Sequence, residues 1–218
     1  MVARGKKQSV DNGAIRALLK HYACPLPYHQ VRALFMGNIA TLDMNASPMK
    51  EVQRLWNDEL PVFESRKEAE AFFASLIHGL WNSLSVHQKR SHPFKLGRIN
   101  TAPASYEYLA RFGRIRREEI DSFLDGLFAG QEEMDLPESA HKAVGALGEL
   151  RALFAATEEM ALKPPGPVDV STMEQTIKHL RELTRIAEDG INTVIQACCK
   201  ARQQMLETYV MERPDTLH

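Results

Sequence analysis

The sequence predicts an all-α protein, a compact irregular helical bundle that ends in a long C-terminal helix. Two observations predict this class: apolar residues recur at helical spacing along most of the chain, and no convincing run alternates with the period of two of a strand. The expected parts are a flexible basic tail at 1–9, a helical domain at 10–163, a proline-rich linker at 164–170 and a long helix at 171–213.

The first two helices are separated by prolines. One helix is expected over about 11–22, with an apolar face at helical spacing. Pro25 and Pro27 end it, because proline lacks the backbone N–H that a helix interior needs. A second helix is expected to follow through Ile39.

Hydroxyl side chains mark the next two helix starts. Ser47 precedes Pro48, and proline at a first helical position costs little because that N–H has no intrahelical partner. Ser65 starts the following helix, and Glu68 completes a capping box with it. Because the apolar face of this helix, which continues through Leu84, is too wide for a surface helix, we expect it at the centre of the core.

The middle of the chain carries one long loop and two further helical regions. Residues 92–103 are rich in proline, glycine and asparagine, which is typical of a loop. Residues 105–130 are expected to form one broken helix or two short ones, interrupted near Gly113. Pro137 is expected to start the next helix.

The last helix has the most regular pattern. Prolines at 164–167 exclude a helix across that stretch, and Ser171 or Thr172 is the expected cap of a helix that runs to Pro214. Its apolar and small residues follow a 3-4 step, which is typical of a coiled-coil or bundle seam, and we expect it to pack on the domain or on a second copy. The predicted self-association seam comprises Ile177, Leu180, Ala187, Ile191, Val194, Cys198 and Met205.

Charge is balanced over the whole chain but not locally. The net charge is −1, which gives no global attraction to nucleic acid, membrane or acidic substrates. Residues 89–117 are nevertheless strongly basic, and 118–138 are acidic. One interpretation is that the basic stretch binds an anion, nucleic acid or an acidic partner, and the other is that the two blocks neutralise each other. The possible interaction surface comprises Arg98, Arg111, Arg114, Arg116 and Arg117.

A DNA-binding helix-turn-helix is a weaker interpretation of the same region. Residues 105–112, a turn at Gly113 and 116–128 have suitable lengths. The would-be recognition helix, however, carries four acidic residues, which phosphates would repel. The pattern therefore argues against sequence-specific DNA binding.

Cysteine and histidine spacing supports neither a disulfide framework nor a standard metal site. The three cysteines (Cys24, Cys198 and Cys199) are odd in number, and two are adjacent, which fits a reducing compartment. The histidines match no standard metal-ligand spacing, and no catalytic motif is present. We therefore expect no enzyme activity and no cofactor.

Five segments carry a family resemblance: residues 47–56 (SPMKEVQRLW), 63–71 (FESRKEAEA), 80–84 (LWNSL), the pair Pro93-Phe94, and 123–130 (FLDGLFAG). Together they resemble the YecA/YgfB-like family of small, all-α bacterial proteins. The chain departs from the family in two ways: it lacks the tryptophan usual before the aromatic-glycine segment, and a long helix replaces the cysteine-rich zinc module of some members. The resemblance therefore implies a fold and carries over no metal site.

These patterns lead to one main functional hypothesis and two alternatives. The main hypothesis is a non-enzymatic, cytoplasmic interaction or regulatory protein that binds a protein partner or a second copy of itself. Its cytoplasmic location is expected because no secretory signal and no membrane-spanning run is present. The alternatives are a nucleic-acid or anion-binding module that uses residues 89–117, and a metal-binding protein.

Overall fold

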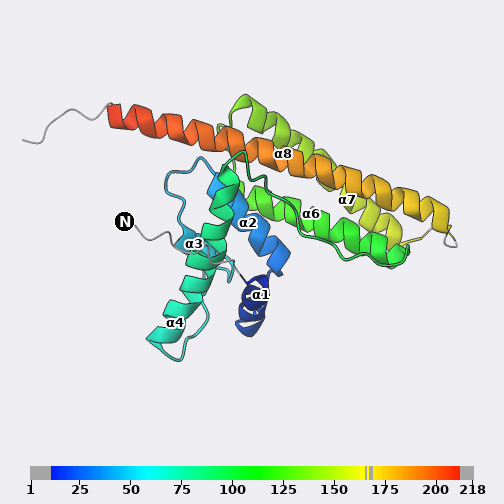
Figure 1. Cartoon of the computed structure of the whole chain (residues 1–218), viewed down its shortest axis with the longest axis horizontal. Helices are drawn as coiled ribbons and strands as arrows, with labels where there is room; N and C mark the ends of the chain where they lie inside the picture. Colours follow the sequence, from blue (N-terminus) through cyan, green and yellow to red (C-terminus); the bar gives the residue numbers. More distant parts are fainter. Residues whose placement is uncertain (1–10, 165, 167–168, 212–218) are drawn as a thin grey trace, which may run out of the picture.

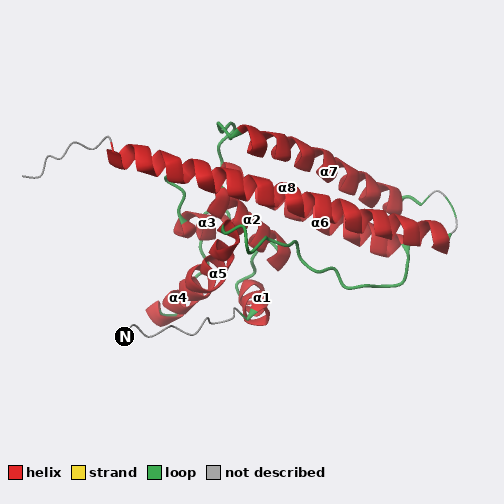
Figure 2. Ribbon diagram, turned by 45° about the horizontal axis from the view of Figure 1, so that its top comes forward, coloured by secondary structure: helices red, strands yellow, loops and turns green. Residues whose placement is uncertain are grey.

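A computed structural model describes residues 11–164, 166 and 169–211, and within them the fold consists of helices and loops (Figures 1 and 2). This confirms the predicted all-α class and the long C-terminal helix. The predicted basic tail at 1–9 lies outside the described residues, as do parts of the linker and the last two residues expected in the long helix.

The N-terminal helices lie close to their expected limits. Helix α1 (Asn12–His21) is capped by Asp11, whose Oδ1 accepts the N–H of Gly13 at 2.8 Å. Helix α2 (Tyr28–Ala40) begins directly after Pro27. From residue 33 to its end, α2 is buried on every side, so it is a core helix.

Short helical segments follow α2. They are α3 (Pro48–Arg54), α4 (Arg66–Phe73), the π-helix η1 (Ala74–Trp81), α5 (Asn82–Leu84) and the 3₁₀-helix η2 (Ser85–Gln88). Ser65 caps α4 as predicted, because its Oγ accepts the N–H of Glu68 at 3.2 Å. Pro48 starts α3 as predicted, although Ser47 makes no side-chain cap bond.

The expectation that the helix after Ser65 lies at the centre of the core is wrong. Its fully buried residues form a single stripe, namely Phe72, Leu76, Leu80 and Leu84. The α4 end points away from the long helices (Figure 1). Its remaining aromatic residues, Phe73 and Trp81, are only partly buried, and their rings contact Phe63 and Phe35 at the edge of the core.

Helix α6 (Tyr106–Phe128) occupies the centre instead. It packs against α2 on one side and α7 (Glu138–Leu162) on the other, and α7 in turn packs against α8 (Val170–Met211) (Figure 2). The predicted break near Gly113 is wrong, since α6 is continuous there, and the helix-turn-helix interpretation fails with it. Gly113 serves packing: an added Cβ would lie 2.6 Å from the Phe154 carbonyl oxygen of α7.

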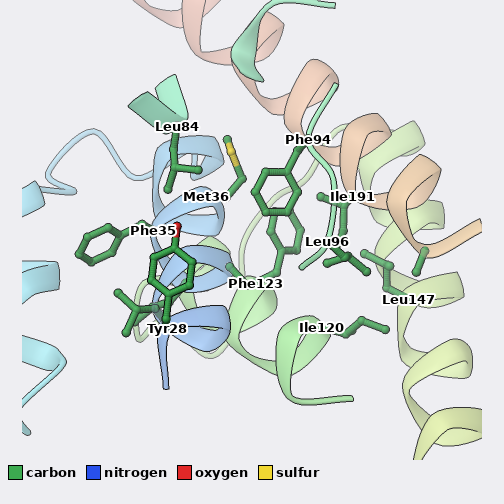
Figure 3. Packing of buried hydrophobic residues seen from close by; sticks show 14 of the residues in the cluster. Tyr28, Phe35, Met36, Leu84, Phe94, Leu96, Ile120, Phe123, Leu147 and Ile191 are labelled. Carbon is green, nitrogen blue, oxygen red and sulfur yellow. The ribbon is translucent and has the colours of Figure 1, made fainter. Parts of the chain in front are cut away.

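Two further glycines bring α2 and α6 into backbone contact. A Cβ on Gly126 would lie 2.0 Å from the carbonyl oxygen of Leu34, and one on Gly37 would lie 2.0 Å from that of Phe123. Neither position therefore accepts a side chain while the helices stay in place. Large apolar side chains surround this crossing and form the core (Figure 3).

Helix α8 starts slightly earlier than predicted. The cap is Asp169, not Ser171 or Thr172, because its Oδ1 accepts the N–H of Ser171 at 3.2 Å. The helix is about 60 Å long at 1.5 Å per residue. It crosses the bundle, and its C-terminal turns extend beyond the other helices (Figure 1). In the described part of the chain, no helix combines the length and apolarity that crossing a bilayer would take.

Candidate functional site

The five arginines of the predicted interaction surface do not form one surface. Arg98 and Arg111 are exposed, and Arg111 donates to the carbonyl oxygen of Asn100 at 3.2 Å. Arg114 and Arg117 both face Glu158 of α7, at 3.8 and 3.1 Å, and Arg117 also lies 3.5 Å from Asp121. Arg116 is buried. Carboxylates of α6 and α7 thus neutralise much of the α6 part of the basic stretch.

Buried Arg116 belongs to a polar site built around a non-helical segment, residues 93–97, which we call the strap. The strap lies between α2, α6 and α8, and each of these helices forms hydrogen bonds with it. Its side chains Phe94 and Leu96 are buried in the core together with Phe123 and Ile191 (Figure 3).

Side chains of α8 hold the first half of the strap by its backbone. Asn192 accepts the N–H of Phe94 at 2.7 Å and donates to its carbonyl oxygen at 2.9 Å. Glu188 accepts the N–H of Leu96 at 3.0 Å, and its other oxygen pairs with the ammonium of Lys95 at 2.8 Å. Since the side chains bond to backbone groups, they fix the register of the strap on α8.

Side chains of α6 hold the last residue of the strap. Glu119 accepts the N–H of Gly97 at 2.7 Å, and Arg116 donates to the Gly97 carbonyl oxygen at 2.9 Å. Arg116 also forms a close ion pair with Glu119 and donates to Thr184 Oγ1 of α8 at 3.2 Å. This arginine therefore joins α6, α8 and the strap.

Helix α2 covers the strap from the remaining side. Arg32 donates to the carbonyl oxygen of Lys95 at 2.6 Å, and its guanidinium lies 4.4 Å from the centre of the Phe94 ring. With this contact, every residue from Phe94 to Gly97 has at least one backbone group bonded to a side chain from another element. The strap is thus bound much as a short peptide is bound in a groove.

Burial governs the electrostatics of this site. It raises the pKa of Glu119, and the guanidinium of Arg116 and the N–H of Gly97 oppose that rise. Removing one member of a buried ion pair leaves the other charged and unpaired, which is strongly destabilising. The arrangement fixes geometry and offers no free acid, base or nucleophile for chemistry.

The predicted seam of α8 is largely used within the chain. Of its seven residues, all but Met205 are buried, and α8 packs against α7 with further contacts to α2, α6 and η2. Cys198 lies in this apolar stripe, where burial raises the pKa of its thiol to about 12. The thiol therefore stays protonated at neutral pH and acts as a small apolar side chain.

Helix α8 leaves the bundle at Arg202. The guanidinium of Arg202 donates to the carbonyl oxygens of Ile39 and Thr41, each at 3.0 Å, at the C-terminal end of α2. Every residue from 203 to 208 is exposed, including Met205 (49%) and Leu206 (44%). We call residues 203–208 the free end of α8.

A second buried polar group lies on α2, away from the strap. Asn38 donates to Glu51 at 3.0 Å, and Arg54 lies 3.1 Å from the same carboxylate. Burial raises the pKa of Glu51 to about 7, and Arg54 opposes that rise. The Oδ1 of Asn38 is buried and has no hydrogen-bond partner among the described residues.

Most residues of the strap site carry no distinctive pattern in the sequence. Glu188 and Asn192 lie on α8 beside the apolar seam, where their spacing matches an ordinary polar flank. Thr184 occupies a position of the 3-4 seam itself and reads there as a small seam residue, and Arg32 lies in an apolar helix. The signal that was present is the run Pro93-Phe94 with Leu96, two large apolar residues in a loop. Within residues 11–164, 166 and 169–211, no group of three or more histidine, cysteine or acidic side chains is placed to hold a metal ion.

No protein-family model, curated protein or solved structure matches the chain. The resemblance to YecA/YgfB-like proteins accordingly stays a prediction.

Proposed function

We propose that the protein is a non-enzymatic helical interaction protein whose partner is a second copy, bound through the free end of α8. One observation carries the proposal: the apolar stripe of α8 continues past the bundle and is uncovered there. Val194 and Cys198 are fully buried, Ala201 is partly buried, and the next positions of the same 3-4 step, Met205 and Thr208, are exposed.

A second copy fits this end because it offers the same stripe. Two-fold symmetric contacts pair one surface with itself, so Met205 and Leu206 of each chain would meet their counterparts or near neighbours. Met205 and Leu206 are 49% and 44% exposed, and burying the exposed half of such a side chain stabilises by about 1 kcal/mol. Four such side chains, two from each chain, give a weak, concentration-dependent dimer.

The helical state of this end also favours a partner. Beyond Arg202, no long-range hydrogen bond joins α8 to the rest of the described chain. Short helices without packing contacts are marginal in water, and most helix stability in proteins comes from packing an apolar face. A neighbouring helix would provide that packing.

Light scattering coupled to size exclusion tests the proposal with Met205→Glu/Leu206→Glu. The matched control is Ile186→Glu, since Ile186 is 48% exposed on the same helix but lies inside the bundle region. Wild type and the control should show a mass that rises with concentration towards a dimer, and the double variant should remain a monomer.

A wild-type mass that stays monomeric at all concentrations would contradict the proposal, as would equal effects of the two variants. Charging Ile191 or Val194 is not a suitable test, because both are fully buried within one chain and the variants would unfold it.

A further inference from the structure

A groove with several charged and amide side chains in its lining follows α8 on the side facing the segment before the strap, and of the free end of α8 only Gln203 touches it. It consists of two adjoining hollows of about 640 and 400 Å³, which share Gln196 and Lys200. Three elements meet there: α8, the first turn of α7 at Ser139, and the segment from η2 to Pro93. We call it the α8 groove.

Three cations line the α8 groove without a carboxylate partner. Lys89 and Arg90 come from the turn after η2, and Lys200 comes from α8. In the described part of the chain, none of the three has a carboxylate oxygen within 4.0 Å, in contrast to Arg114, Arg116 and Arg117 of the same basic stretch. The groove has one acidic lining residue, Asp189, so its net charge is positive.

Two amide side chains in the lining, Gln196 and Asn192, are fixed by hydrogen bonds to backbone groups. Gln196 donates to the Gln88 carbonyl oxygen at 3.1 Å, and Asn192 is fixed by its two bonds to Phe94. These bonds give the groove rigid walls, from which the cationic side chains extend. Ser139 lies in the first turn of α7, whose cap residue makes no side-chain bond to the N–H groups there.

We propose that the α8 groove binds a small phosphate-bearing molecule, with Lys89, Arg90 and Lys200 as the charged contacts. Charge-assisted hydrogen bonds from arginine and lysine to phosphate are among the stronger polar contacts in proteins. A volume of about 640 Å³ falls within the range of small-molecule sites, about 300–1,000 Å³.

A small ligand fits the groove better than a nucleic-acid strand. Single-strand binding combines a long run of cations with aromatic side chains on which bases stack, and no aromatic residue lines either hollow. Arg98 and Arg111, two exposed arginines of the basic stretch that pair with no carboxylate among the described residues, are not among the lining residues, so they do not extend the groove into a charged track.

Titration of ¹⁵N-labelled full-length protein with inorganic pyrophosphate at constant ionic strength tests the proposal. Saturable amide shifts are expected at Arg90, Ser139, Gln196 and Lys200. The variant Arg90→Gln/Lys200→Gln should weaken binding by about tenfold or more. Both side chains are exposed, so the fold should be retained, and thermal unfolding would confirm it.

The matched control is Arg98→Gln/Lys178→Gln, which removes two exposed cations outside the groove and gives the same change in net charge. Pyrophosphate affinity should stay at the wild-type value in this control. Absence of saturable shifts would overturn the proposal, and so would an equal loss of affinity in both variants. A single-stranded RNA oligomer that binds more tightly than pyrophosphate and depends on Arg98 would also overturn it, in favour of a nucleic-acid surface.

Discussion

The two sides of α6 are built from opposite kinds of contact. On the α2 side, Gly37 and Gly126 let the two backbones touch among large apolar side chains. On the face towards the strap and α8, Arg116 and Glu119 form buried ionic contacts and hydrogen bonds. The first side depends on the absence of side-chain atoms, whereas the second depends on particular atoms being present.

The two kinds of contact serve different purposes in α6: the apolar contacts stabilise the fold, and the polar contacts position the strap. Close apolar packing on the α2 side supplies stability, and the two glycines fix the point at which α2 and α6 cross. Hydrogen bonds to the backbone of Phe94, Leu96 and Gly97 are directional and fix how the strap and α8 are placed. The polar side therefore fixes the strap against α6 and α8, while α8 itself packs mainly on α7.

The largest effect is expected from Gly126→Ala. The added methyl would lie 2.0 Å from the Leu34 carbonyl oxygen, so α2 and α6 would have to separate. We expect the free energy of unfolding to fall by about 5 kcal/mol or more, as measured by urea unfolding.

Gly148→Ala is the control for that change, because nothing lies within 4 Å of its added Cβ in the middle of α7. It should stabilise by about 0.5–1 kcal/mol, the usual gain for alanine over glycine in a helix. Similar effects of the two substitutions would refute the contact between the α2 and α6 backbones.

The next largest effect is expected on the polar side, from Arg116→Met. The change leaves Glu119 buried without its cation, and the free energy of unfolding should fall by about 4 kcal/mol. Arg117→Met, one position along the same helix, removes a partly exposed pair with Glu158 and should cost under about 1 kcal/mol. If both cost the same in urea unfolding, the buried network does not hold the strap as described.

A smaller, pH-dependent effect is expected from Glu51, the buried carboxyl group that accepts a hydrogen bond from Asn38 of α2. The pKa of Glu51 is about 7 in the folded protein, above its ordinary value of 4.5, so the folded state binds the proton more tightly. Its contribution to stability is therefore present below about pH 4.5 and is lost as the pH rises through 7. Glu51→Gln removes this titration, and its stability relative to wild type should rise by about 3 kcal/mol between pH 4.5 and 8.

Urea unfolding of both proteins at a series of pH values measures that difference directly. Parallel curves for wild type and Glu51→Gln would show that the Glu51 carboxyl titrates alike in the folded and unfolded states.

Much of the fold was predictable because its signals are local. Asp11, Pro48 and Ser65 lie at helix starts as expected, since caps and prolines act within one turn. Gly113 misled the prediction, because glycine as a helix breaker and glycine as a close-packing residue look alike in sequence. Only the position of α7 decides between the two.

The strap site was not predictable, because its members become neighbours only in three dimensions. Asn192 and Phe94 are 98 residues apart, and Glu188 resembles any polar residue that flanks a seam. The arginines of the basic stretch stand out in the sequence, but which carboxylate each one meets depends on the fold: Arg116 pairs with Glu119 of its own helix, whereas Arg114 and Arg117 reach Glu158 of α7. Among the residues that the structure describes, Lys89 and Arg90 of the same stretch meet no carboxylate.

Hydrogen exchange read by mass spectrometry at low and high protein concentration tests the central claim, that the α8 stripe is closed inside the bundle and open at the free end. We predict that amides of residues 177–199 are protected equally at both concentrations. Amides of residues 203–208 should exchange rapidly in dilute protein and slowly in concentrated protein. Concentration-dependent protection within 177–199, or none at 203–208, would contradict the account.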